Sequence, residues 1–272
     1  MLLALSINNT HVVLGVYRDE ALVGTWRIRT NPPRTADEYA VLLRSFMSAE
    51  VKVLSAESPS PQHSALSTQH SVSALIGDVV IGSVVPTLTP VFVELADRYL
   101  AADAVVVGPG IKTGIRLLVE NPREVGADRI ANTLATHRRY GGPAIVVDMG
   151  TATTFDVVSS EGDFLGGAIA PGIEISLQAL TERAALLHRV DLVRPRSAVG
   201  KNTITNIQSG AVFGYVGLVE GLVGRIKAEL GPCKVIGTGG AIGVVAPETK
   251  AIDVVDQQLT LDGLRMLWAL NR

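Results

Sequence analysis

The same order of candidate strands and polar turns occurs twice in the sequence, and this repeat constrains the fold more than any other feature. Residues 2–7 are apolar and predict a strand, followed by an Asn-rich turn, a strand at 11–17, an acidic turn and a third strand at 22–29. The same order returns over residues 144–170, with polar turns after Asp148 and after Val158.

Each copy continues in the same way. A helix candidate follows the three strands, at 35–49 in the first copy and at 173–187 in the second, and strand–helix signals come later, over 78–101 and from Lys234 on. A duplicated βββαβα unit predicts two similar α/β domains that face each other across a cleft, with a polar hairpin from each domain lining it.

The second hairpin carries the strongest local chemical signal. A fully apolar run ends at Asp148, Gly150 allows a tight turn, and three threonines lie within the next four residues. Backbone N–H groups and threonine hydroxyls at such a turn suit phosphate, and the Asp148 carboxylate suits a cation. The alternative is an ordinary hairpin whose Asp and Thr side chains satisfy their own turn.

Composition narrows the class of protein. Of 272 residues, 47% are hydrophobic but only 4% are aromatic, a balance typical of α/β sheets built from Val, Ala, Leu and Ile. A net charge of −2 gives no reason to expect nucleic acid as a partner, and the one cysteine, Cys233, excludes an intrachain disulfide framework. Polar residues interrupt the apolar start, and no apolar run approaches a membrane span, so we expect a cytoplasmic protein with no membrane partner.

Three further stretches invite a functional interpretation. Residues 55–73 are rich in Ser, Pro, Gln and His and predict a mobile insertion, in which a solvated loop explains His63 and His70 better than metal binding does. Asp128 and Arg129 open a helix candidate, either as a helix cap and salt bridge or as a general base beside an anion holder. The Gly-rich run at 237–240 ends a strand and would let the backbone approach a flat ligand such as adenosine.

Taken together, the ordered motifs resemble those of the type III pantothenate kinases, a family within the acetate/sugar kinase–heat-shock protein 70–actin superfamily. The resemblance covers nearly the whole chain outside 55–73. It rests on Ser83-Val-Val-Pro86, Gly108-Pro-Gly-Ile-Lys-Thr-Gly114, Asn121-Pro-Arg-Glu-Val-Gly-Ala-Asp-Arg129, Asp148-Met-Gly-Thr-Ala-Thr-Thr-Phe-Asp156, Gly166-Gly-Ala-Ile-Ala-Pro-Gly172, Gly200-Lys-Asn-Thr203, Ile207-Gln-Ser-Gly210 and Gly237-Thr-Gly-Gly240.

The resemblance implies a fold and an activity. The fold is α/β, with duplicated actin-like (ribonuclease H-like) domains at 1–115 and 116–272, each a mixed five-stranded sheet flanked by helices. The activity is transfer of phosphate from ATP to the primary hydroxyl of pantothenate, the first step towards coenzyme A. The implied cofactors are ATP, Mg²⁺ and a monovalent cation, K⁺ or NH₄⁺, and the implied assembly is a homodimer.

The resemblance also implies residue roles. Asp128 corresponds to the proton acceptor for the pantothenate hydroxyl, and Asp148 to the residue that binds the monovalent cation. Pantothenate is implied to contact Val119, Gly126, Ala127, Asp128, Arg129 and Thr203. ATP is implied to contact the first hairpin and the second, at Ser6, Ile7, Asn8, Asn9, Thr10, His11, Val12, Val13 and Thr151.

Two positions depart from the family pattern. The first hairpin of the family usually reads Asp-x-Gly-Asn-Thr, whereas this chain has Ser6 and Asn8 in place of the Asp and the Gly. The internal repeat makes the same point, because the second hairpin keeps Asp148 and Gly150. Losing a charge that neutralises the transition state costs several kcal/mol, so the alternative function is a weakened or non-catalytic homologue that binds nucleotide or pantothenate.

Val119 stands where the family generally has a tyrosine in the pantothenate pocket. Valine keeps an apolar wall but removes a hydroxyl, which leaves open a kinase acting on another small hydroxy acid. The apolar stretch at 218–223 is either core or dimer interface, and core is the default expectation.

Overall fold

The computed structural model describes residues 1–56, 76–184 and 186–272, which form two compact units. The first unit contains Met1–Lys112, Gly126–Ala131 and Leu261–Arg272, and the second contains Thr113–Val125 and Asn132–Thr260. The predicted loop at 55–73 lies outside the described residues, except that its first two positions end a helix.

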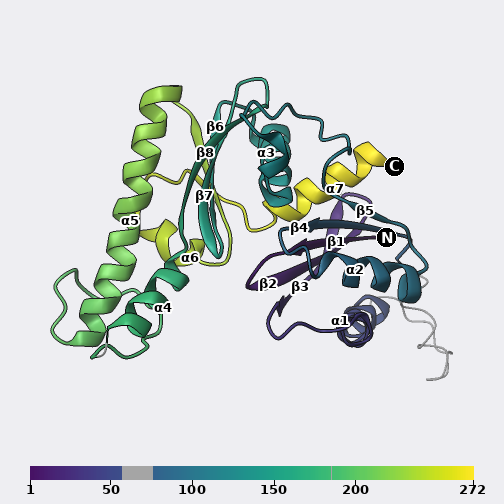
Figure 1. Cartoon of the computed structure of the whole chain (residues 1–272), viewed down its shortest axis with the longest axis horizontal. Coiled ribbons are helices and arrows are strands. Elements are labelled where there is room, and N and C mark those ends of the chain that lie inside the picture. Colours follow the sequence, from purple (N-terminus) through teal and green to yellow (C-terminus); the bar gives the residue numbers. More distant parts are fainter. Residues whose placement is uncertain (57–75, 185) are drawn as a thin grey trace. The chain divides into compact units, whose positions relative to one another are not determined.

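The sheet of the first unit has five strands in the order β3-β2-β1-β4-β5 (Figure 1). The strands are β1 (Leu2–Ile7), β2 (His11–Arg18), β3 (Ala21–Arg29), β4 (Asp78–Ser83) and β5 (Ala104–Val106). β1 pairs antiparallel with β2 and parallel with β4, so the carboxyl ends of β1 and β4 lie at one edge, with Ile7 opposite Ser83.

Helices cover both faces of this sheet. On one face, α1 (Ala36–Ala56) and α2 (Thr89–Leu95) contribute Tyr39, Leu43 and Phe92 to a core with alternate residues of β1, β2 and β4. On the other face lies α7 (Leu259–Asn271), where a Cβ at Gly82 would come within 2.6 Å of Leu264. Gly82 therefore leaves room for the Leu264 side chain of α7, which any larger residue would have to displace.

The sheet of the second unit repeats this topology, in the order β10-β9-β6-β7-β8. Its strands are β6 (Ala144–Met149), β7 (Ala152–Val158), β8 (Phe164–Pro171), β9 (Lys234–Thr238) and β10 (Val254–Val255). If the five strands are numbered in chain order and the sheet is read from β8, the order is again 3-2-1-4-5. The first of them, β6, is antiparallel to the second, β7, and parallel to the fourth, β9. The duplication expected from the sequence is confirmed, as are two mixed five-stranded sheets flanked by helices.

Helices also lie on both sides of the second sheet (Figure 1). On one side are α4 (Ile173–Arg183), α5 (Thr203–Leu230) and α6 (Ile242–Val245), and α5 contributes Tyr215, Val219 and Val223 to the core. α3 (Ala127–Tyr140) lies on the other side. Because its residues up to Ala131 are assigned to the first unit, α3 supplies residues to both.

Three predicted helices differ from the structure. The one expected at 35–49 is α1, which runs on to Ala56. The one expected at 173–187 ends at Arg183, and the described residues from there to Asn202 form no helix or strand. The one expected to reach Ala101 becomes π-helical over Ala96–Leu100 and stops at Ala101, which has a left-handed φ of 50°. Hydrophobic periodicity located the helical segments correctly. It did not predict that α4 ends at Arg183 or that the hydrogen-bond pattern becomes π-helical over Ala96–Leu100.

Candidate functional site

The first hairpin is closed by hydrogen bonds among its own polar residues. The Asn8 N–H donates to the His11 carbonyl at 2.9 Å, and the Thr30 hydroxyl donates to the Asn8 carbonyl at 2.6 Å. The side-chain amide of Asn8 donates to the Ser6 hydroxyl at 3.1 Å. Ser6 is only 3% exposed, so this hydroxyl lies at the base of the turn rather than on its rim.

The residues implied to contact ATP at this hairpin differ in what they expose. The side chains of Ile7 and Val12 are fully buried in the core, so only their backbone groups are available to a ligand. Asn9 is exposed, and Thr10, His11 and Val13 are half-buried. Contact with a phosphate at this turn would therefore come from the tip of the hairpin and from its backbone.

The first unit brings the Asp128 motif to the same sheet edge as this hairpin. The Val84 N–H, just after β4, donates to the Ile7 carbonyl at 3.0 Å. On the far side of Val84, a Cβ at Gly126 would come within 3.3 Å of the Val84 Cγ1. The contact series Ile7–Val84–Gly126 therefore joins the end of β1 to the residue that precedes α3, although 119 positions separate Ile7 from Gly126 in the sequence.

Asp128 lies in the first turn of α3. Its Oδ1 accepts a hydrogen bond of 2.8 Å from the Arg129 N–H and would lie 2.5 Å from a Cβ at Gly126, so the glycine makes room for the carboxylate. Burial raises the pKa of the Asp128 carboxyl, and the Arg129 N–H opposes that shift. A buried carboxyl with a raised pKa at a helix N-terminus is a candidate general base.

The second hairpin holds its carboxylate differently. Asp148 Oδ2 accepts a hydrogen bond of 3.0 Å from the side-chain amide of Asn132 on α3, and the Asn132 oxygen accepts one of 2.8 Å from Thr260. The Gly150 N–H closes the turn on the Ala152 carbonyl, and the Thr151 carbonyl accepts from the Gly172 N–H. The two hairpins thus share a topology, but only the second carries a charge at its base.

The Gly-rich run at 237–240 packs directly against the second hairpin. β9 pairs parallel with β6, which places Thr238 opposite Asp148. Gly239 has a φ of +94°, and a Cβ there would lie 2.6 Å from Asp148 Oδ1. Both the backbone conformation and the lack of space therefore favour glycine at this position. The sequence motifs at 148 and 237–240, which lie about 90 positions apart, form one polar edge of the second unit.

The remaining substrate candidates lie in the second unit. Val119 is half-buried, and its Cγ1 would lie 3.6 Å from a Cβ at Gly166. Thr203 is exposed at the first position of α5, where Asn202 and Thr205 form a capping box. The other residues implied to contact pantothenate, Gly126, Ala127, Asp128 and Arg129, belong to the first unit.

Sequence reasoning missed the residues that orient these groups. Asn132 is fully buried and fixes Asp148, and Thr30 fixes the carbonyl of Asn8. A signal for Asn132 existed, because it stands one helical turn after Asp128 and beside Thr133 in the predicted helix. No sequence signal pointed to Thr30, because it comes close to Asn8 only when the third strand pairs beside the hairpin.

The site offers few ligands for a metal. Among the described residues, no group of three or more His, Cys, Asp or Glu side chains could hold an ion. The single charge and oxygen donors of the Asp148 turn fit a weakly bound monovalent cation. The Ser6 hydroxyl, neutral and already bonded to Asn8, does not fit direct coordination of a divalent ion in place of a carboxylate.

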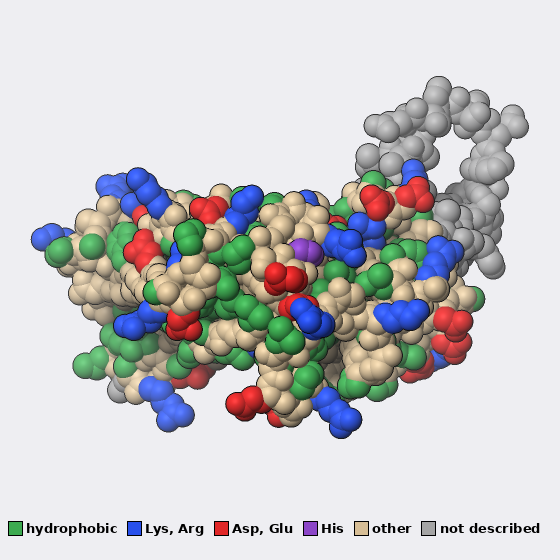
Figure 2. Space-filling view, turned by 90° about the horizontal axis from the view of Figure 1, so that it is seen from above, with side chains coloured by type: hydrophobic (Ala, Val, Ile, Leu, Met, Phe, Trp, Pro, Cys, Tyr) green, Lys and Arg blue, Asp and Glu red, His purple; other side chains and the backbone are tan. Residues whose placement is uncertain are grey.

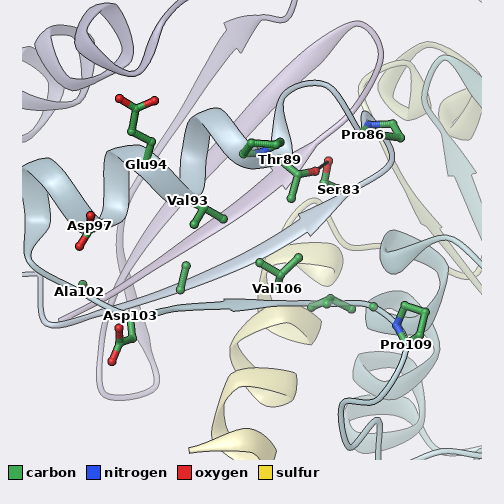
Figure 3. A pocket seen from close by; sticks show the side chains of 14 residues that line it. Ser83, Pro86, Thr89, Val93, Glu94, Asp97, Ala102, Asp103, Val106 and Pro109 are labelled. Atoms are coloured by element: carbon green, nitrogen blue, oxygen red, sulfur yellow. Dashed lines mark hydrogen bonds between the residues drawn. The ribbon is translucent and has the colours of Figure 1, made fainter.

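A separate groove of about 890 Å³ lies on the first unit between α2 and β5 (Figure 3). Val93 and Val106 point into it, Ser83 and Thr89 meet at one end, and Asp97 and Asp103 lie toward the other. None of the predicted site residues lines it, but Ser83, Pro86, Gly108 and Pro109 do, so two motifs of the sequence meet there. Its carboxylates do not suit an anionic substrate.

Two solved structures share the fold. A Campylobacter jejuni protein described as a Baf family transcriptional activator matches with a TM-score of 0.54 at 16% identity, over 98% of this chain and 96% of that one. A Sinorhizobium meliloti protein described as a 2-dehydro-3-deoxygalactonokinase matches with a TM-score of 0.54 at 12% identity, over the same shares.

Sequence comparison is far more specific. The family model described as type III pantothenate kinase matches residues 2–225. Proteins with that name are 46% identical in Moorella thermoacetica over 272 residues and 48% identical in a Roseiflexus species over 273 residues, both with all of each chain covered. One from Myxococcus xanthus is 44% identical over 273 residues, covering all of this chain and 99% of its own. With the duplicated fold and the two hairpins, these matches show that the chain belongs to the type III pantothenate kinase family.

Proposed function

We propose that this chain transfers the γ-phosphoryl group of ATP to the primary hydroxyl of pantothenate, giving 4'-phosphopantothenate for coenzyme A biosynthesis. The observation that carries the proposal is the contact series Ile7–Val84–Gly126, which brings the first hairpin and Asp128 to one sheet edge. Phosphoryl transfer depends mostly on positioning and on charge neutralisation, so a phosphate-binding turn beside a base is the required equipment.

In this proposal Asp128 is the general base. Its carboxylate takes the proton of the pantothenate hydroxyl, the hydroxyl oxygen bonds to the γ-phosphorus, and the bond from that phosphorus to the bridging oxygen breaks to release ADP. The raised pKa of Asp128 supports this role, since a base titrating nearer to neutral pH holds the proton more strongly. Arg129, with Gly126 and Ala127, would bind the pantothenate carboxylate.

The second unit would supply the other contacts. Val119 and Thr203 are proposed contacts of pantothenate, and Thr151 is a proposed contact of the nucleotide. Asp148 would hold a monovalent cation, K⁺ or NH₄⁺, oriented by Asn132. Mg²⁺ would supply charge neutralisation for the ATP phosphates, and the Ser6 hydroxyl would act on the ion only through water. By sequence, the proposed domains are 1–115 for the first hairpin and 116–272 for the substrate, cation and adenosine motifs. The compact units differ from this division, because Gly126–Ala131 and Leu261–Arg272 belong to the first unit.

The proposed assembly is a homodimer, and the outer face of α5 supports it. Gly210, Gly214, Gly217, Gly221 and Gly224 recur every three or four residues, all are exposed, and a Cβ at any of them would meet nothing within 4 Å. Each costs about 1 kcal/mol of helix stability relative to alanine. Five such residues on the face opposite the core leave room for the close approach of another copy, which supports the proposed dimer.

The proposed location is the cytoplasm, with neither membrane nor nucleic acid as a partner. α5 is long and apolar enough, by length and composition, to cross a membrane. Its Tyr215, Val219 and Val223 lie in the core of the second unit, which supports a core helix instead. The face in Figure 2 carries Lys and Arg interspersed with Asp and Glu, a pattern that does not suit a polyanion.

The test is an assay of phosphopantothenate formation from ATP and pantothenate with Mg²⁺ and K⁺, in which mass spectrometry detects the product. Product from the wild type, with formation at least about 10²-fold slower in Asp128→Asn, would support the proposal. Calorimetric binding of both ligands with no product would instead favour a non-catalytic homologue. Faster phosphorylation of another hydroxy acid in a substrate panel would move the assignment away from pantothenate.

A further inference from the structure

The segment that precedes the Asp128 motif is attached to the edge of the second sheet. The Phe164 N–H donates to the Arg116 carbonyl at 2.9 Å, and the Leu118 N–H donates to the Phe164 carbonyl at 2.9 Å. Leu117 thereby forms an isolated parallel bridge with Phe164, the first residue of the edge strand β8. Residues 116–118 therefore extend the sheet by one short piece of strand, which we call the strap.

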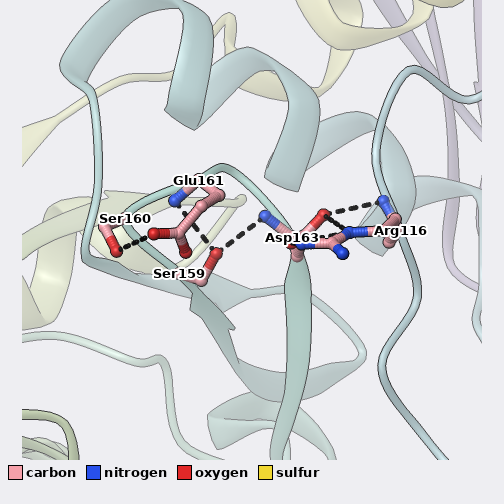
Figure 4. Close-up of polar contacts among 5 residues, drawn as sticks. All are labelled: Arg116, Ser159, Ser160, Glu161 and Asp163. Atoms are coloured by element: carbon pink, nitrogen blue, oxygen red, sulfur yellow. Dashed lines mark hydrogen bonds and ion pairs between the residues drawn. The ribbon is translucent and has the colours of Figure 1, made fainter.

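A charged pair fixes the strap at its first residue (Figure 4). Arg116 donates to Asp163 from its backbone N–H at 3.0 Å and from Nε at 3.0 Å to each carboxylate oxygen, and Nη2 adds a further ion pair. The Asp163 side chain is only 7% exposed, whereas that of Arg116 is 70% exposed. Arg116 holds the pKa of Asp163 below its usual range, so the pair is charged at neutral pH.

The turn that carries Asp163 is itself rigid. The Ser159 hydroxyl accepts hydrogen bonds of 3.1 Å from the backbone N–H groups of Glu161 and Asp163 (Figure 4). Gly162 has a φ of +92°, and a Cβ there would lie 2.5 Å from the imidazole of His137 on α3. The turn therefore lies directly against α3, the helix that begins at the proposed base.

One anchor, the Arg116–Asp163 pair, thus fixes the start of the loop that runs from residue 119 to the 3₁₀ turn Pro122–Glu124. Val119 is the first residue after the strap and lies against Gly166 of β8. A segment that hydrogen bonds hold in place has few conformations to lose when a ligand binds.

We propose that Arg116 and Asp163 are a positioning pair, which holds Val119 against Gly166 as a wall of the pantothenate pocket. This inference rests on the proposed function. The proposed pair differs from a purely structural salt bridge, because loss of the pair is expected to affect the binding of one substrate through one side chain, Val119. Neither residue touches the reacting groups, and their effect passes through the strap.

The test uses Arg116→Gln in the full-length enzyme. The expected result is a KM for pantothenate raised about tenfold, with the KM for ATP changed by less than about twofold, because only the substrate wall is released. Arg116→Lys keeps the charge but not the forked geometry, so it is expected to recover only part of the loss. Arg194→Gln is the matched control, because Arg194 also pairs an exposed guanidinium with a carboxylate of the second unit, Glu248, at 2.8 Å.

Two further measurements separate positioning from general destabilisation. In a double-mutant cycle with Val119→Ala, Arg116→Gln should have no further effect on the pantothenate KM, because the side chain through which it acts is already gone. Hydrogen exchange should show the Leu118 and Phe164 amides losing protection in Arg116→Gln but not in Arg194→Gln.

Additive effects in the cycle, or equal rises in both KM values, would overturn the inference while leaving the proposed function intact. Unchanged amide protection would overturn it without any assay of turnover. If the wild type forms no phosphopantothenate, the proposed function fails, and the substrate role of the pair fails with it. In that case, hydrogen exchange would test only whether Arg116 holds the strap in place.

Discussion

The side-chain amide of Asn8 donates a hydrogen bond of 3.1 Å to the hydroxyl of Ser6, and this pair occupies the base of the first hairpin. In the second hairpin the same two places are held by Asp148 and Gly150. The two changes in the first hairpin are therefore coupled, because the amide of one residue satisfies the hydroxyl of the other. A carboxylate at position 6 would need both a cation and a new arrangement of Asn8.

This coupling predicts the behaviour of Ser6→Asp. The single variant should be less stable than the wild type without Mg²⁺, because position 6 is 3% exposed and a buried carboxylate costs several kcal/mol unless it is paired. Mg²⁺ with ATP should restore its melting temperature. The measurement is thermal unfolding with and without the ligand.

Adding Asn8→Gly should change the effect of Ser6→Asp. Because the two side chains are in contact, we expect a coupling free energy of about 0.5–3 kcal/mol and a lower KM for Mg-ATP in the double variant than in either single one. Strictly additive effects across the four proteins would show that the Ser6–Asn8 hydrogen bond does not govern the hairpin.

Replacing Asp128 should separate activity from stability. Asp128→Asn should lower kcat by about 10²- to 10⁴-fold, the range for a lost general base. Because burial raises the folded-state pKa above the ordinary value of 3.8, what Asp128 contributes to stability is present below that value and is lost as pH rises through the raised pKa. At neutral pH the variant should therefore melt no lower than the wild type.

The raised pKa also predicts the acid limb of the pH profile. Since the base must be ionised, kcat/KM should fall on acidification at a higher pH than an ordinary aspartate would give. A rate profile between pH 4 and 8 checks this. Wild-type turnover by Asp128→Asn would remove Asp128 from the mechanism.

The cation requirement should depend on Asp148. Asp148→Asn keeps the size of the side chain but removes its charge, so the K⁺ concentration for half-maximal rate should rise by about tenfold or more. Asp191→Asn, an exposed aspartate of the same unit, is the control and should leave the K⁺ titration unchanged. An unaltered K⁺ requirement in Asp148→Asn would show that the ion binds elsewhere.

The glycine face of α5 gives opposite predictions for a monomer and for a dimer. In a monomer, Gly217→Leu would stabilise the exposed helix by about 1 kcal/mol. In the proposed dimer, the added side chain would hold the two copies apart, and the variant should sediment at half the mass. Gly243→Leu, at an exposed glycine of α6 with open space around it, is the control and should leave the mass unchanged.

Much of the fold was predictable, because the strands and turns are local. Apolar runs that stop at Asn8 or Asp148 predict hairpins, and seeing the order twice predicts two domains. The ends of the helices could not be predicted in the same way. No strong sequence signal marks the end of α4 at Arg183 or the π-helical turn at Ala96–Leu100.

The sequence by itself determined the family, the duplicated α/β fold and the identities of the candidate residues, because these depend on residue order and periodicity. Tertiary structure decided which of them meet. Parallel pairing of β1 with β4 and of β6 with β9 brings Val84 to Ile7 and Thr238 to Asp148, and a fully buried Asn132 orients that carboxylate. Such contacts join residues that are distant in the chain, and they form only when the sheets close, so no local pattern encodes them.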